Sequence, residues 1–185
     1  MSFAAALLLL SGSAFDLDPM WRPVADPLAP ARAGKVQCHE PDPDARTCRI
    51  MTWYSVRADG VAEMRSVTAI SNEMGLAAEA RMTLRPEKGG MCGVVNDAHM
   101  ASYRIVQLRA PHAAVKNDRL YIRYRQELLD ALWNRKHCAF NYSRAGDDMR
   151  LDVSTVDGQF AGEMMAEFLW ISPGASWRLK ASAAA

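Results

Sequence analysis

The sequence lacks the short motifs that most directly reveal an enzyme or a cofactor site. It contains no Cys-x-x-Cys pair, no His-Glu-x-x-His metal motif and no Gly-x-Ser-x-Gly nucleophile elbow. The glycine-rich stretch 89–93 is not followed by the Lys-Ser/Thr of a phosphate-binding loop. No internal repeat is visible, and no apolar run approaches the ~20 residues that a membrane-spanning helix needs. We therefore expect no transmembrane segment, no metal site and no cofactor.

The chain also lacks a strong net charge. Its 22 basic residues face 21 acidic ones, which leaves a formal charge of +1 at pH 7. Proteins that bind nucleic acid through a generally basic surface carry a much larger excess. We therefore expect no nucleic-acid partner.

The N-terminus indicates export. An apolar block from Phe3 to Leu10 leads into small residues from Ser11 to Ala14, which is the order of a secretory signal and its cleavage site. Residues 1–14 are therefore predicted to be a signal peptide, and the protein is predicted to be periplasmic or secreted. No Lys or Arg precedes Arg22, which leaves open a start further upstream. The alternative is a cytosolic protein with an apolar N-terminus.

The rest of the chain divides by composition into a linker, one domain and a tail. Residues 15–34 contain four prolines among many alanines, and such spacing disfavours regular structure, so this segment is predicted to be a Pro/Ala-rich linker. Residues 35–180 show no second break and are long enough to bury one core. Residues 181–185 are predicted to be a disordered, Ala-rich tail.

Four cysteines in an exported chain predict two disulfides. Cys38 and Cys48 flank a turn-rich stretch that would bring two neighbouring strands together, so the preferred pairing is Cys38 with Cys48 and Cys92 with Cys138. The other two pairings stay open at this stage. Each disulfide is expected to stabilise the fold by roughly 2 to 4 kcal/mol.

Hairpin signals dominate the secondary-structure pattern. Asp59-Gly60 and Asp157-Gly158 each separate two runs rich in β-branched and aromatic residues, as expected for tight turns between antiparallel strands. Helices are predicted in the middle, at 97–108 and, more strongly, from Asp118 onwards, where apolar residues recur every three or four positions. The expected fold class is α+β: an antiparallel sheet built from hairpins, with one or two helices packed on one face and two disulfides.

Charge is unevenly distributed along the chain. Eight basic and three acidic residues lie between 104 and 136, whereas acidic residues dominate from 147 to 170. One interpretation is a basic contact face for an envelope protein or an anionic envelope component. The alternatives are that both segments are solvated, or that they lie against each other. The candidate binding residues are Arg119, Arg123, Arg125 and Arg135.

The function predicted from these features is an exported, disulfide-bonded binding or interaction module of the cell envelope. The competing hypothesis is a small periplasmic hydrolase with a carboxylate or Cys/His site. His137-Cys138 suggests the thiol form, but neighbours on a strand point to opposite faces, so the two side chains would not meet. No catalytic residue can be assigned from the sequence.

Overall fold

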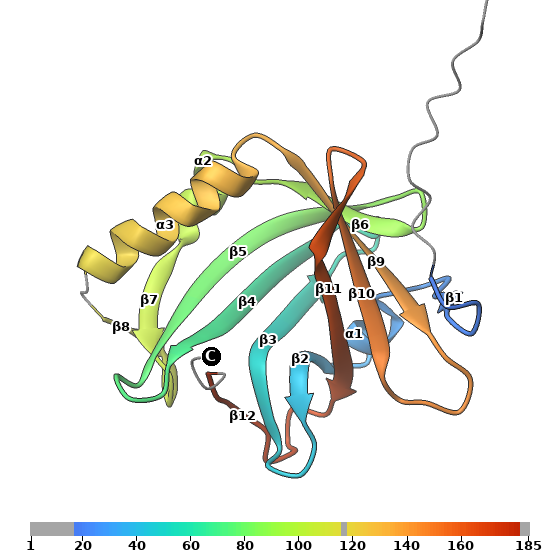
Figure 1. Ribbon diagram of the computed structural model, residues 1–185, viewed down its shortest axis with the longest axis horizontal. Helices are drawn as coiled ribbons and strands as arrows, with labels where there is room; N and C mark the ends of the chain where they lie inside the picture. The colour runs from blue at the N-terminus through green and yellow to red at the C-terminus, as the bar shows by residue number, and fades with distance from the viewer. Residues whose placement is uncertain (1–16, 116–117, 182–185) are drawn as a thin grey trace, which may run out of the picture.

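The computed structural model describes residues 17–115 and 118–181, and it is built mostly of strands, with 52% strand and 14% helix. The strands curve around a common axis, and the longest helix lies across one side of them (Figure 1). In chain order the elements are β1 (Arg22–Pro23), α1 (Ala29–Arg32), β2 (Val36–Asp42), β3 (Thr47–Val56), β4 (Ala62–Ser71), β5 (Leu76–Glu87), β6 (Gly90–Val94), α2 (Asp97–Ser102), β7 (Arg104–Gln107), β8 (Ala110–Ala114), α3 (Asp118–Leu132), β9 (Lys136–Ser143), β10 (Arg150–Val156), β11 (Gln159–Ile171) and β12 (Arg178–Leu179).

Eight of these strands close into an antiparallel barrel. The order around the ring is β2, β3, β4, β5, β6, β9, β10 and β11, and each strand pairs with the next. The ring closes where β11 pairs with β2. A barrel of eight strands has an interior just wide enough to be filled by side chains or to hold one small ligand.

The expectation of an α+β fold, with helices packed on one face of a sheet, is therefore wrong. The two predicted hairpins exist, with Val56 opposite Ala62 and Val156 opposite Gln159. The sheet closes on itself because β11 pairs with β2 and β6 pairs with β9. Those pairings join segments far apart in the sequence. No tight turn connects the paired strands, so no turn motif in the sequence predicts them.

The helix predictions had mixed outcomes. The helix predicted from Asp118 is confirmed as α3. The segment 97–108 is not one helix: it divides into the short α2 and the strand β7, because Tyr103 between them is extended, with φ −70° and ψ 129°.

The barrel interior is packed with apolar side chains along part of its length. Met82, Leu84 and Met91 form one buried cluster with Leu28 and Ala31, which come from the segment that carries α1. Leu28 is only 3% exposed. Part of the predicted linker thus packs against the barrel, and β1 pairs with β9. Residues 1–16, with the predicted signal peptide, lie outside the described residues, and the predicted domain boundaries stay a prediction.

Between β6 and β9 the chain leaves the barrel and forms a smaller layer beside it. The first part of β5 pairs with β7, whereas its last part pairs with β6, so β5 belongs both to the barrel and to this layer. Tyr103 and Ile105 pack there against Leu120, Tyr121 and Tyr124, and this contact anchors α3. No helix among the described residues is both long and apolar enough to cross a bilayer.

The C-terminal segment folds back on the outside of the barrel. β12 pairs in parallel with β3, and Trp177 packs against Val36 and Ile171. Ala181 exchanges two hydrogen bonds with the side chain of Asn72, of 2.8 and 2.9 Å. The rest of the predicted tail, residues 182–185, lies outside the described residues.

The disulfide pairing is the one that the sequence favoured. Cys38 on β2 joins Cys48 on β3, with their Cα atoms 5.2 Å apart. Cys92 on β6 joins Cys138 directly opposite on β9, so this bond secures one of the two non-local pairings that close the barrel. Two disulfides are consistent with an oxidising compartment.

One buried acid on the outer surface of the barrel is surrounded by arginines. The Glu79 side chain is fully buried, and its oxygens accept hydrogen bonds from Arg65 (2.8 Å), Arg81 (3.2 Å) and Arg104 (3.0 and 3.1 Å). Burial by itself raises the pKa of Glu79, but the hydrogen bonds and charges of Arg65 and Arg104 outweigh it and lower the pKa to about 2. This network joins β4, β5 and β7.

Replacing Glu79 with Gln should remove an acid-sensitive part of the stability. Because the folded-state pKa lies below the ordinary value of 4.5, the carboxylate stabilises the fold above about pH 4.5 and loses this effect as the pH falls through about 2. The shift of the Glu79 pKa from 4.5 to about 2 corresponds to roughly 3 kcal/mol of folding free energy. We expect Glu79→Gln to lower the free energy of unfolding in urea near pH 7, and to flatten its decline between about pH 5 and pH 2. Exposed Glu73→Gln is the control, and equal profiles for the two variants would contradict the prediction.

Gly93 on β6 should not tolerate a side chain. A Cβ there would lie 2.6 Å from the Met82 sulfur, 2.9 Å from Leu84 Cδ2 and 2.9 Å from the Thr83 carbonyl oxygen, and the last of these belongs to backbone that cannot move aside. We expect Gly93→Ala to lower the free energy of unfolding by about 1 to 3 kcal/mol. Gly174, which has no atom within 4 Å of such a Cβ, is the matched control. Equal unfolding midpoints for the two alanine variants would show that β6 is not tightly packed against β5.

Candidate functional site

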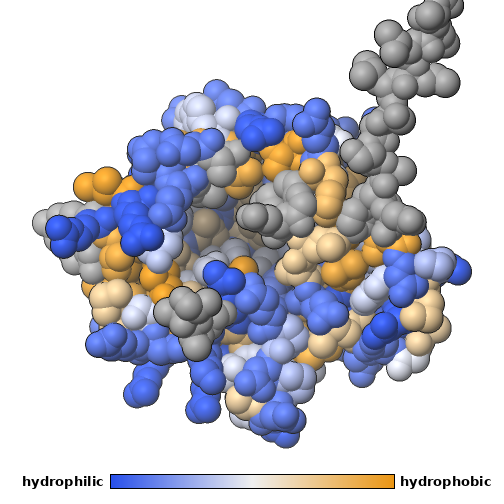
Figure 2. Space-filling view, viewed as in Figure 1, coloured by the Kyte–Doolittle hydropathy of each residue, from blue (hydrophilic) through white to orange (hydrophobic). Residues whose placement is uncertain are grey.

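A cavity of about 350 Å³ lies inside the barrel and is lined from all eight of its strands. One part of its wall is apolar, and another part carries polar and ionisable side chains. Figure 2 shows a hollow in the middle of one face of the molecule, with hydrophobic surface near its rim. The apolar lining includes Leu28, Ile50, Met64, Met82, Leu84 and Met91.

The first polar group in the interior is centred on Gln37. The Tyr54 hydroxyl donates to the Gln37 side-chain oxygen at 2.6 Å, and the ring Nε2 of His39 lies 3.2 Å from the same oxygen. Since an amide oxygen only accepts, Nε2 carries the proton of His39 in this arrangement. Burial lowers the pKa of His39 to about 4 and, together with the charge of Asp152, raises the pKa of Tyr54. Both side chains are therefore neutral at physiological pH.

The second polar group consists of Asp152 and Asn141. The Asn141 side-chain nitrogen donates to Asp152 Oδ1 at 3.3 Å. Burial raises the pKa of Asp152 to about 7, and the hydrogen bond from Asn141 only partly opposes this shift. The interior thus holds a carboxyl group that changes its charge near neutral pH.

A series of aromatic rings packs beside these polar groups. His39 and Phe168 lie on neighbouring strands with ring centroids 5.3 Å apart, and Phe168 meets Trp170 edge-on at 6.0 Å. Trp170 in turn contacts Tyr54, at 6.2 Å. His39 and Tyr54, the two partners of Gln37, are each in contact with one of these rings.

The sequence analysis missed these residues because alternation does not reveal which face of a strand is inside. Asp152 and Ser154 alternate with the buried Leu151 and Val153 on β10. In an open sheet such a polar face is normally the one exposed to solvent. In the closed barrel it lines the cavity. The only signal available was the recurrence of polar residues at every second position on neighbouring strands.

A second cavity, of about 710 Å³, adjoins the first beneath α3. Tyr124 and Glu127 of α3 face Thr68 of β4 and Ala80 of β5 across it. Ser66 lines both cavities, so the two spaces meet at that residue. The α3 helix therefore borders the second cavity, which leads to the barrel cavity at Ser66.

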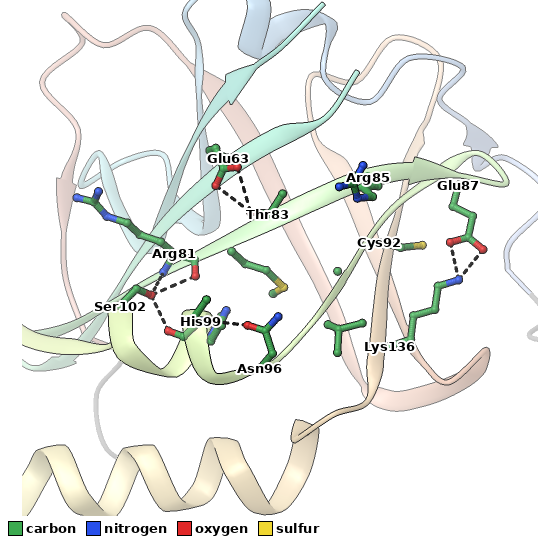
Figure 3. A pocket seen from close by; sticks show the side chains of 14 residues that line it. Glu63, Arg81, Thr83, Arg85, Glu87, Cys92, Asn96, His99, Ser102 and Lys136 are labelled. Atoms are coloured by element: carbon green, nitrogen blue, oxygen red, sulfur yellow. Dashed lines mark hydrogen bonds and ion pairs between the residues drawn. The ribbon is translucent and has the colours of Figure 1, made fainter. Parts of the chain in front are cut away.

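A third space, of about 550 Å³, is a groove on the outside of the barrel between β5, β6 and α2 (Figure 3). Its polar side chains largely pair with each other. Thr83 donates to both oxygens of Glu63, and the Ser102 hydroxyl donates to backbone oxygens and accepts from the amide of Arg81. His99 is an exception, because both of its ring nitrogens are buried without a hydrogen-bond partner in the described structure.

His99 does not form a metal site with its neighbours. Its pKa is lowered by burial and then by His137, so the imidazole is neutral. No group of three or more His, Cys, Asp or Glu side chains that could hold a metal ion is found within residues 17–115 and 118–181.

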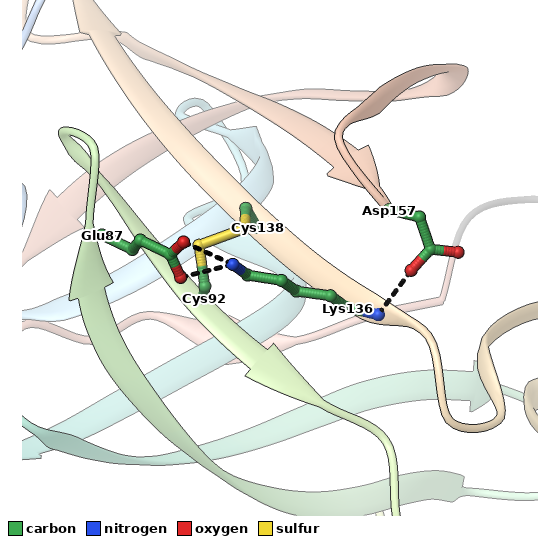
Figure 4. Close-up of a disulfide and its surroundings, with 5 residues drawn as sticks. All are labelled: Glu87, Cys92, Lys136, Cys138 and Asp157. Carbon is green, nitrogen blue, oxygen red and sulfur yellow. Dashed lines mark hydrogen bonds and ion pairs between the residues drawn. A yellow bond between two sulfur atoms is a disulfide. The ribbon is translucent and has the colours of Figure 1, made fainter.

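The Cys92–Cys138 disulfide borders this groove and has charged neighbours. Figure 4 shows Lys136 beside it, with its ammonium paired to Glu87 and its backbone amide donating to Asp157 at 2.9 Å. His137 lines the barrel cavity, whereas its neighbour Cys138 is bonded to Cys92. The side chains of His137 and Cys138 thus have different surroundings, and neither Cys92 nor Cys138 is a free thiol.

The four arginines proposed from the sequence are not gathered at one cavity. Arg119, Arg123 and Arg125 lie on α3, and Arg135 follows its end. Arg123 pairs with Glu127 at 3.0 Å. Arg135 pairs with Asp157 at 2.8 Å, so at this point the basic and acidic segments contact each other. A partner for these arginines stays a prediction.

Comparison with known proteins adds no identification. No family model, no curated protein and no solved structure matches the chain. Function must therefore be argued from the cavity itself.

Replacing Asp152 with Asn should stabilise the protein at high pH. The carboxyl ionises near its ordinary pKa of 3.8 in the unfolded chain but only near pH 7 in the folded protein, so ionisation increasingly disfavours folding between these values. Above pH 7, ionisation of Asp152 lowers the free energy of unfolding by up to about 4 kcal/mol. In urea titrations we expect the free energy of unfolding of Asp152→Asn to exceed that of the parent protein near pH 8. Below pH 4 we expect the two free energies of unfolding to be nearly equal.

The control for this measurement is Asp148→Asn, which changes an exposed acid in the loop before β10. A similar gain in both variants, or a gain that does not depend on pH, would show that the raised pKa of Asp152 is not the cause.

Proposed function

We propose that this protein is an exported binding module that takes up a small organic molecule in the interior of its barrel. The observation that carries this proposal is the cavity of about 350 Å³ inside the closed ring of strands, whose lining combines apolar side chains with a few polar and ionisable ones. Ligand sites are typically concave, mostly apolar and provided with a few fixed polar groups, and they span ~300 to 1,000 Å³. The cavity lies at the lower end of that range.

The fixed position of the polar groups supports binding rather than mere filling of a core. A core of this size would be more stable with apolar side chains in place of Asp152, since a buried carboxyl with one weak hydrogen bond costs free energy. Gln37 and Tyr54 are held by a short hydrogen bond and by neighbouring rings. Such preorganised groups are what a site needs in order to orient a small ligand.

The disulfides support the exported part of the proposal. Both bonds join strands of the barrel, β2 with β3 and β6 with β9, so they secure the wall around the cavity. A binding site whose wall is cross-linked keeps its shape outside the reducing interior of the cell.

The competing hydrolase hypothesis gains less from the structure. Its Cys/His form has no thiol to use, because all four cysteines are in disulfides. Its carboxylate form requires two acids that converge. Glu40 also lines the cavity, but its side chain pairs with Arg49 at 2.9 Å.

A dye that fluoresces in apolar surroundings tests the proposal. N-phenyl-1-naphthylamine carries no charge between pH 6 and pH 8, and we expect its fluorescence to rise on addition of the folded protein with saturable, one-site binding. Ala166→Phe places a large ring in the cavity beside Asp152. We expect this variant to weaken dye binding at least about tenfold, the effect of losing ~1.4 kcal/mol of binding free energy.

The matched control is Glu167→Phe, which adds the same ring at the next residue of β11, on an exposed side chain. Circular dichroism confirms that both variants are folded. Dye that fails to bind the parent protein, or binds Ala166→Phe as well as Glu167→Phe, would show that the barrel interior is not the binding site.

A further inference from the structure

Among the described residues, the Asp152 carboxyl has no positively charged partner inside the barrel. Its hydrogen-bond donor in the described structure is the neutral amide of Asn141. None of the ion pairs between described residues includes Asp152. Glu79 is a useful contrast, because this fully buried acid is contacted by three guanidinium groups. The same fold thus neutralises one buried acid and leaves the other without a counter-charge.

The other ionisable groups in the cavity cannot supply that charge. In the described part of the lining they are His39 and Glu40 from β2, Tyr54 from β3 and His137 from β9. Burial lowers the pKa of both histidines, so each is neutral at physiological pH. Nε2 of His39 already faces Gln37, as does the hydroxyl of Tyr54. The remaining strands contribute serine, alanine and apolar side chains to the described lining.

The surroundings of Asp152 suit an organic cation better than a bare metal ion. A hard metal ion would need several oxygen ligands around it, and no group of three or more His, Cys, Asp or Glu side chains that could hold a metal ion is found among the described residues. The same lining holds methionine and leucine side chains, and it holds Tyr54, whose pKa is raised by burial and by the charge of Asp152. An ammonium group can pair with one carboxylate while the hydrocarbon attached to it fills apolar space, and aromatic faces attract such cations.

We propose that the barrel interior selects a small organic ammonium ion, with its nitrogen paired to Asp152 and its apolar body against the methionine and leucine side chains of the wall. This inference rests on the function proposed above, and it adds the chemical class of the ligand. Selection follows from charge, because an anion would meet Asp152 with no compensating cation, and a neutral molecule would leave the carboxylate unpaired.

Binding is coupled to a proton at Asp152. In the protein without ligand this carboxyl is about half protonated near pH 7, and a bound ammonium stabilises its ionised form. Binding therefore releases a proton below about pH 7. Affinity for the cation rises with pH up to that point, by as much as tenfold per pH unit, and levels off above it.

A matched series of three small molecules tests the proposal by isothermal titration calorimetry. 2-Phenylethylamine, 2-phenylethanol and phenylacetate share a ring and differ in the charge of the group attached to it. We expect the parent protein near pH 8 to bind the amine at least about tenfold more tightly than the alcohol, and the anion most weakly. Cyclohexylmethylamine and cyclohexylmethanol repeat the comparison with a body of different shape.

Asp152→Asn is the decisive variant, and it is expected to fold because it removes a destabilising charge. The amine should lose its advantage over the alcohol in this variant, while the uncharged dye still binds. Asp148→Asn should behave as the parent protein. Titration near pH 6 in two buffers of different ionisation enthalpy should show proton release with the amine and none with the alcohol.

The outcomes separate this inference from the proposed function. If the dye binds in the cavity but neither amine is preferred over its alcohol, or if Asp152→Asn keeps the preference, the ammonium class is wrong and the binding function stands. If neither the dye nor any of the small molecules binds, both proposals fail. A preference that persists unchanged at high salt and vanishes in Asp152→Asn supports a pair shielded inside the barrel.

Discussion

The pairing of β11 with β2 is the interaction on which the rest of the structure depends. It joins Val36–His39 to Phe168–Ile171, residues near opposite ends of the domain. Together with the pairing of β6 and β9 it turns a row of hairpins into a closed wall. A closed wall has no free edge and separates an interior from solvent. The raised pKa of Asp152, the neutral state of His39 and the cavity itself all follow from that separation.

The two buried acids show how differently one fold can treat the same chemical group. Glu79 lies on the outer side of the barrel, where β4, β5 and β7 each provide an arginine, and its pKa is low. Asp152 lies in the interior, where its hydrogen bond in the described structure comes from the neutral amide of Asn141, and its pKa is high. The first arrangement links strands. The second places a carboxyl with a raised pKa and no cationic partner among the described residues in a cavity. Ionisable groups with strongly shifted pKa values in a cavity are characteristic of ligand sites.

Local features were readable from the sequence wherever a short segment decides its own conformation. Asp157 and Gly158 both adopt positive φ, 53° and 78°, as a tight hairpin turn requires. The spacing of apolar residues after Asp118 predicted α3. The preferred cysteine pairing was correct, since Cys38 and Cys48 lie on strands joined by one turn. The candidate site was not readable, because Asn141 and Asp152 look like ordinary solvent-facing residues until the barrel is known to close.

The sequence by itself determined the hairpins, the α3 helix and the presence of cysteines in numbers suited to two disulfides, because these depend on turn chemistry and on the spacing of neighbouring residues. Only the tertiary structure decided that the hairpins form a barrel, which strand faces point inward, and which acid receives a counter-charge. Those outcomes depend on which strands pair and which faces turn inward, and the contact of His39 with Phe168 joins residues more than a hundred positions apart. Local propensity carries no information about such contacts, whereas closure of the wall fixes them all at once.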